Sequence, residues 1–258
     1  MLTVLSPAKA LNMDPVETAP TEPVFAGDAL RLARTARNLA LKDLKALMHL
    51  SDNLAKLNRD RYRAFSEAPA PDQVKPAILA FDGDTYVGLD ARSMEPDALR
   101  YAEDHLRILS GLYGLLRPFD AIQAHRLEMG SRLKTRRGRS LYDFWGDQIA
   151  KALTAQAEAV GSDTLLNCAS KEYFTAADRP ALKLRVIRPT FLENRGGVER
   201  VESLHAKRAR GAMARFVMEN RVRDPQGLRD FDYHGYAYAA DRSTAEAPVF
   251  VRTWPEDG

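Results

Sequence analysis

The spacing of hydrophobic positions changes several times along this chain, which predicts alternating strands and helices. Residues 1–5, 77–81 and 163–168 are short apolar runs bounded by turn-forming or polar residues, a pattern typical of buried strands. Longer segments repeat their apolar positions at helical spacing, at residues 28–65, 96–109 and 141–160. Ser51-Asp52 interrupts the first of these and predicts a break between helices.

The C-terminal part of the chain is predicted to be richer in strands. Residues 184–192 and 198–204 are β-rich and are separated by Asn194-Arg195-Gly196-Gly197, which is compatible with a hairpin turn. Shorter runs at 236–238 and 249–251 predict closing strands. The chain contains no internal repeat and no evident linker, so we expect residues 1–258 to form one compact α/β (mixed α+β) domain with a mixed sheet and flanking helices.

Composition places the chain among ordinary globular proteins. It has 258 residues, of which 45% are hydrophobic and 28% charged. No apolar run approaches the roughly 20 residues that span a bilayer, and the N-terminus lacks signal-peptide features, so we expect a cytoplasmic protein without membrane partners. Cys168 is the single cysteine, and the five histidines lack metal-ligand spacing. We therefore expect no metal and no cofactor, and we also expect a monomer.

Positive charge is concentrated in two segments, although the whole chain carries only +3. Residues 125–139 contain six Lys and Arg residues against one Glu, and residues 205–221 contain five against one. These segments carry +5 and +4, which leaves −6 on the remainder. Such segregation is typical of a protein that binds a polyanion with one surface.

The second basic segment is predicted to be an amphipathic helix over residues 206–221. At about 100° per residue, one side collects Ala206, Ala209, Met213, Phe216 and Val217. The opposite side collects Lys207, Arg208, Arg210, Arg215 and Arg221. A solvated charged face is the alternative, but Glu219 alone opposes these cations within the helix, so i,i+4 pairs do not explain them. Gly211 in a helix interior indicates close approach of another backbone or of a ligand.

Two further groups of residues are candidates for function. Gly111 and Gly114 lie between apolar segments, with Arg117 following, and could join two short helices whose backbone N–H groups grip phosphate. The alternative is a packed corner between helices. Polar residues also follow the predicted strands, and a pocket is predicted from Lys9, Asp84, Glu128, Asp147 and Asn167. Turn-forming Asp and capping Ser residues would explain part of this pattern without any function.

Several motifs occur together in one order along the chain. They are Ser6-Pro7-Ala8-Lys9, residues 81–89, residues 109–118, residues 126–130, residues 141–147 and residues 206–211. In these motifs the chain resembles the YaaA family, also named UPF0246. The resemblance implies a role in bacterial resistance to peroxide stress, where it limits damage driven by iron. It also implies an unusual fold that binds DNA through a basic cleft and a helix-hairpin-helix element.

We therefore expect a sequence-tolerant DNA-binding protein whose partner is double-stranded or structured DNA. Its expected DNA contacts are Lys207, Arg208, Arg210, Arg215, Gly111, Gly114, Arg117, Arg126, Arg132, Lys134, Arg136 and Arg137. The main alternative is an enzyme that acts on a small phosphorylated or nucleotide-like substrate in the predicted pocket. A third possibility is an acidic protein partner. The chain has no Walker A loop and no Gly-x-Ser-x-Gly motif, so the sequence identifies no reaction.

Overall fold

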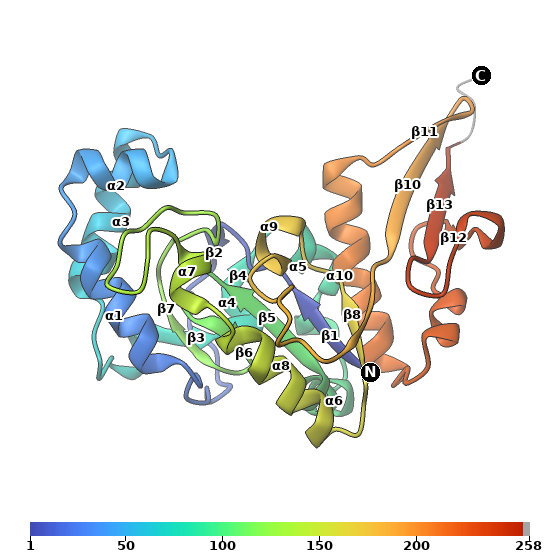
Figure 1. The fold of residues 1–258 in the computed structure, drawn as a ribbon, viewed down its shortest axis with the longest axis horizontal. Coiled ribbons are helices and arrows are strands. Elements are labelled where there is room, and N and C mark those ends of the chain that lie inside the picture. The colour runs from blue at the N-terminus through green and yellow to red at the C-terminus, as the bar shows by residue number, and fades with distance from the viewer. Residues whose placement is uncertain (255–258) are drawn as a thin grey trace.

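The structure, a computed structural model, describes residues 1–254 and is built around a five-stranded sheet (Figure 1). Its strand order is β6-β5-β1-β8-β9. The strands are β1 (Leu2–Leu5), β5 (Leu106–Ser110), β6 (Gly114–Leu116), β8 (Thr164–Asn167) and β9 (Arg185–Ile187). β1 lies in the centre and pairs in parallel with both neighbours, so that Val4 is opposite Arg107 on one side and Asn167 on the other. All four residues of β1 are buried, as expected for a parallel strand covered on both faces.

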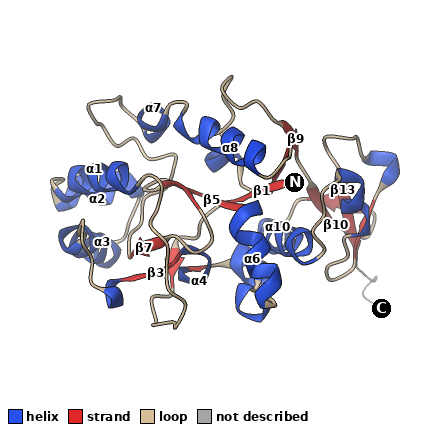
Figure 2. Cartoon of the chain, turned by 90° about the horizontal axis from the view of Figure 1, so that it is seen from below, coloured by secondary structure: helices blue, strands red, loops and turns tan. Residues whose placement is uncertain are grey.

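Helices cover both faces of this sheet. Figure 2 shows α8 on one side of β1 and β5, and α6 and α10 on the other. The helices are α6 (Pro96–His105), α7 (Leu141–Trp145), α8 (Gln148–Ala159), α9 (Lys171–Phe174) and α10 (Ser203–Glu219). Within residues 1–254, no helix has the length and hydrophobicity that crossing a bilayer requires.

A second sheet packs against the far side of α10. Its order is β11-β10-β13-β12, and it comprises β10 (Thr190–Arg195), β11 (Val198–Arg200), β12 (Tyr236–Tyr238) and β13 (Val249–Thr253). α10 contacts both β1 and β10, and therefore joins the two sheets. Phe191 and Phe250 of the second sheet belong to the same hydrophobic cluster as Leu2 and Leu5. One continuous core thus supports the whole fold, and the expected mixed α/β class is confirmed.

The N-terminal helices lie at the opposite end of the molecule from the second sheet (Figure 1). They are α1 (Ala26–Arg37), α2 (Leu41–Met48) and α3 (Asp52–Ala64). Two small sheets, β2 with β4 and β3 with β7, connect this end to the centre. The remaining elements are β2 (Ala10–Leu11), β3 (Val74–Pro76), α4 (Ala77–Ala80), β4 (Phe81–Asp82), α5 (Asp84–Leu89), β7 (Ala121–Gln123) and 3-10 helices at Pro71–Gln73, Ala91–Ser93, Pro225–Asp230 and Ala240–Arg242.

Most predicted strands are present, although the run predicted at 198–204 is a strand only to Arg200 and enters α10 at Ser203. Three other apolar segments fold differently. Residues 77–81, predicted as a strand, form the helical turn α4 before the two-residue strand β4, since a short apolar run does not distinguish a strand from a buried helical turn. The helix predicted over 96–109 ends at His105, where β5 begins. The helix predicted over 141–160 breaks at Gly146, which has a φ of 49°.

The glycine-bracketed segment forms a β-hairpin between β5 and β6 rather than a turn between two helices. Both glycines are buried and serve close packing. A Cβ on Gly111 would lie 2.2 Å from the backbone oxygen of Leu127, and one on Gly114 would lie 2.7 Å from the ring of Trp145. Their backbone N–H groups therefore do not face solvent, and the expected phosphate-gripping helix-hairpin-helix does not occur at this segment.

Candidate functional site

The basic helix α10 is packed more deeply than an amphipathic surface helix. Ala206, Ala209, Met213 and Val217 are buried as expected, but Gly211, Ala212, Ala214 and Met218 are buried too. A Cβ on Gly211 would lie 1.8 Å from the backbone oxygen of Thr85 in α5. A Cβ on Gly88 would likewise lie 1.9 Å from the backbone oxygen of Arg208. Glycine at 211 is therefore explained by backbone contact between α5 and α10, one of the two explanations inferred from the sequence.

Acidic residues of α10 itself and of other elements neutralise several cations of the second basic segment. Arg208 lies 3.4 Å from Asp84, and Arg215 lies 3.2 Å from Asp90 and 2.8 Å from Glu219. Arg221, beyond the end of α10, pairs with Asp97. Lys207 and Arg210 form no ion pair within residues 1–254. The expected field of five outward cations is thus divided into three paired and two unpaired side chains.

The loop of the first basic segment has an alternating pattern of burial. Leu127, Met129, Ser131 and Leu133 are buried, whereas Arg132 and Lys134 are exposed. This extended segment therefore turns its cations outward together, as a strand would. Arg136 and Arg139 are also exposed, and none of these four cations has an ion pair among residues 1–254.

The other cations expected to bind DNA are engaged within the protein. Arg126 donates through two nitrogens to one oxygen of Glu128, at 3.0 and 2.8 Å. Arg137 lies 3.0 Å from Asp28 of α1 and packs over the ring of Phe144. Arg117 lies 2.8 Å from the fully buried carboxylate of Asp120. These arginines hold the loop and the β-hairpin in place.

A cavity of about 470 Å³ opens where β1 and β8 end, and we call it the strand-end cavity. Its walls come from four separate parts of the chain. They are residues 6–10 after β1, residues 82–85 at the start of α5, residues 168–173 after β8, and Lys207 with Arg210 of α10. Because the carboxyl ends of parallel strands meet at one edge of a sheet, polar residues that follow β1 and β8 are brought together, as the sequence predicted.

Hydrogen bonds fix the floor of the strand-end cavity. The hydroxyl of Ser6 accepts from the backbone N–H of Ser170 at 2.8 Å. A carboxylate oxygen of Glu172 accepts from the backbone N–H of Gly130 at 2.9 Å, which ties the first basic segment to this edge. Cys168 also lines the cavity, but burial raises its pKa to about 12, so the thiol stays protonated at neutral pH.

The structure brings together some of the residues predicted to form a pocket. Lys9 and Asp84 line the strand-end cavity, and Glu128 lies beside it, 3.6 Å from Lys9. Asn167 is not part of the lining, because its side chain accepts the backbone N–H of Ala169 and closes the turn after β8. Asp147 is exposed at the start of α8, outside the cavity.

Comparisons with known proteins support the family resemblance that the sequence motifs indicate. A family model described as peroxide stress protein YaaA matches residues 1–242. The chain belongs to the YaaA family. Relatives named UPF0246 protein include those of Ruegeria pomeroyi, 60% identical over 98% of this chain and 99% of the relative, and of Roseobacter denitrificans, 58% identical over 99% of each. Membership in the YaaA family supports a role in peroxide stress.

One feature of this YaaA family member was missed in the sequence. Two consecutive helices joined by a tight turn do occur, but they are α2 and α3. His49 ends α2 in the left-handed conformation with a φ of 51°, and Ser51 caps α3 by accepting from the backbone N–H of Leu54. The break predicted at Ser51-Asp52 was the available signal, and it marked the turn without identifying the helix pair.

Proposed function

We propose that this protein binds DNA through phosphate contacts during peroxide stress. The observation that carries the proposal is the sorting of cations in the two basic segments. Within residues 1–254, six of them have no acidic partner, namely Lys207, Arg210, Arg132, Lys134, Arg136 and Arg139. Cations without a protein partner are available to replace the counterions of a phosphate backbone.

Contacts of this type fix the position of DNA without reading its sequence. The first turn of α3 lies at the exposed residues Asp52 and Asn53, and the backbone N–H groups of a helix N-terminus suit a phosphate oxygen. Displacing counterions from the phosphates would also displace bound iron(II). Hydroxyl radicals form where iron(II) meets peroxide, so a bound protein would reduce damage to the DNA that it covers.

The decisive test is the double variant Lys207→Ala/Arg210→Ala. If each side chain neutralises one phosphate, the slope of log Kd against log salt falls by about 1.8 for duplex DNA. Fluorescence anisotropy of a labelled duplex over a series of salt concentrations measures this slope. The charge-matched control is Lys151→Ala/Lys183→Ala, which removes two exposed cations that have no ion pair among residues 1–254. An unchanged slope in the α10 variant, or an equal change in the control, would refute the proposal.

A second candidate function rests on the convergence of polar groups in the strand-end cavity. Lys9, Lys207 and Arg210 line it together with Ser6 and the acidic residues Asp82, Asp84 and Glu172. This set suits a small phosphorylated or nucleotide-like ligand, whose phosphate would meet the cations and whose hydroxyls would meet the carboxylates.

Isothermal titration with mononucleotides tests this second candidate. Saturable binding that is lost in Lys9→Ala, while the salt slope for duplex DNA is unchanged, would favour a ligand-binding cavity over a purely electrostatic DNA surface. Absence of mononucleotide binding at millimolar concentration would reject the candidate.

A further inference from the structure

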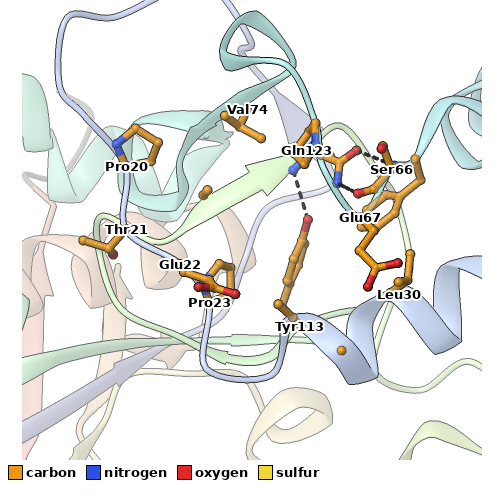
Figure 3. A pocket seen from close by; sticks show the side chains of 15 residues that line it. Pro20, Thr21, Glu22, Pro23, Leu30, Ser66, Glu67, Val74, Tyr113 and Gln123 are labelled. Carbon is orange, nitrogen blue, oxygen red and sulfur yellow. Dashed lines mark hydrogen bonds between the residues drawn. The ribbon is translucent and has the colours of Figure 1, made fainter.

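A second cavity, of about 430 Å³, lies at the other end of the protein, beside α1 (Figure 3). We call it the strap cavity, because residues 20–23 of the segment before α1 form one wall. The opposite walls are the first turns of α1, residues 65–69 after α3, and strands β3 and β7. Its volume falls within the range of sites for small organic ligands.

Hydrogen bonds to residues 117–121 fix the strap that encloses this cavity. The backbone N–H of Thr21 donates to the oxygen of Phe119 at 2.8 Å, and its carbonyl accepts from Ala121 at 2.7 Å. Its hydroxyl donates to Asp120 at 2.8 Å. Arg117 donates to the carbonyl of Glu22 at 2.8 Å. The cavity is therefore preformed, and a ligand would not have to order a loose segment on binding.

The walls are largely apolar, and the floor carries one buried hydroxyl. The apolar lining includes Pro20, Pro23, Leu30, Phe65, Pro69 and Val74. Tyr113, which is 3% exposed, lies at the floor, where its hydroxyl accepts from the backbone N–H of Gln123 at 3.0 Å. Among residues 1–254 the Tyr113 hydroxyl has no acceptor for its own proton. Figure 3 shows this phenol rising between the strap and the Gln123–Ser66 pair.

The charge of the strap cavity is opposite to that of the basic segments. Glu22 and Glu67 are the charged side chains of its lining, and no Lys, Arg or His contributes to it. Glu67 lies 3.3 Å from Arg34, but both side chains are mostly exposed, so this pair screens the carboxylate weakly. Burial raises the pKa of Tyr113, which keeps its hydroxyl protonated as a donor.

We propose that the strap cavity is a binding site for a small organic amine with an apolar or aromatic body. The body would pack against the proline, leucine and phenylalanine side chains. The ammonium group would face Glu22 and Glu67 at the rim, and a ligand oxygen or nitrogen would accept from Tyr113. Anionic ligands such as phosphates are disfavoured there, which separates this site from the proposed DNA surface and from the strand-end cavity.

The test compares three probes of similar size, namely phenethylamine, phenethyl alcohol and phenylacetate. Titrations followed by protein NMR should give the tightest Kd for the amine, with the alcohol weaker by roughly threefold to tenfold and phenylacetate weakest. In Glu22→Gln/Glu67→Gln the amine and the alcohol should bind equally. Glu17→Gln, on the exposed part of the same segment, is the matched control and should keep the preference for the amine.

A filling variant tests the location of the site. Gly27→Phe places a ring at the rim, where an added Cβ meets no atom within 4 Å, and it should abolish binding of all three probes. Unchanged probe binding in Gly27→Phe would overturn the proposal, and so would tighter binding of phenylacetate than of phenethylamine. Absence of binding of every probe to the unaltered protein would overturn it as well. Should Gly27→Phe not fold, the Glu→Gln pair decides the question alone, because both carboxylates are exposed.

Discussion

Replacing Gly211 by Ala should destabilise the protein, although the same change stabilises an ordinary helix. In a helix interior, Ala is favoured over Gly by about 1 kcal/mol. Here the new Cβ would lie 1.8 Å from the backbone oxygen of Thr85, whereas side-chain carbons do not approach other atoms closer than 3.0 Å. The obstacle is backbone and no rotamer change relieves it, so α5 and α10 must separate by more than 1 Å.

The expected magnitude follows from the two opposing contributions. Overpacking a dense interior costs about 1 to 3 kcal/mol, and more where backbone must move. Because backbone must move here, we take the upper end of this range, about 3 kcal/mol, and subtracting the gain of about 1 kcal/mol in helix propensity leaves a loss of about 2 kcal/mol in the free energy of unfolding. Gly88→Ala should behave similarly, and the double variant should lose less than the sum, because one separation of the helices relieves both contacts.

Urea unfolding followed by far-UV circular dichroism measures these free energies. Gly27→Ala is the matched control, since Gly27 is also helical and an added Cβ there meets no atom within 4 Å. It should be neutral or more stable by up to about 1 kcal/mol. A Gly211→Ala protein as stable as the unaltered one would show that the two backbones are not in contact, and the packing argument would fail.

Three further predictions concern His125, Cys168 and iron-driven damage. His125 is buried, and burial lowers its pKa to about 4, whereas the unfolded chain has an ordinary histidine pKa near 6.5. Between these two pH values the unfolded state therefore binds more protons at His125 than the folded state does. The free energy of unfolding should fall by about 3 kcal/mol as pH drops from 6.5 to 4. An NMR titration of His125 in the folded protein with a midpoint near 6.5 would contradict this prediction. Cys168, held as a thiol by burial, should react with iodoacetamide at least tenfold more slowly than the same residue in urea, and equal rates would refute its burial. Finally, saturating protein should reduce strand cleavage of plasmid DNA by iron(II) and peroxide, and the Lys207→Ala/Arg210→Ala variant should protect the DNA less. Equal protection by the two proteins would show that protection does not depend on these phosphate contacts.

Strands and turns were predicted correctly where the residue pattern is compatible with only one kind of structure. The buried strands at residues 1–5 and 163–168 and the turn at Gly196-Gly197 were of this kind, because a short β-rich run next to a turn leaves few alternatives. The prediction failed where one residue pattern is compatible with two different structures. Gly111 and Gly114 are equally suited to a helical turn and to a close-packed β-hairpin, and the residues that pack against the hairpin, Leu127 and Trp145, come later in the chain.

The types of residue at the candidate site could be predicted from the sequence, but the ion pairs that they form could not. Residues after β1 and β8 were expected to converge, since the geometry of parallel strands requires it. Which arginines are available for DNA was not predictable, because the carboxylates that neutralise Arg208 and Arg215 come from α5 and the turn after it, more than 100 residues earlier. Counting charges along the helix reveals only partners on the same helix, such as Glu219 for Arg215.

The central position of β1 has a consequence for how the chain folds as it is made. Residues 2–5 are synthesised well before their partners, residues 106–108 and 165–167. At about 5 to 20 residues per second, the last partner follows after roughly 10 to 30 seconds. Until then β1, a largely apolar strand, lacks at least one of its two neighbours in the sheet. We therefore expect the central sheet to be completed late, with the unpaired edge of β1 open to aggregation until residues 165–167 have been made.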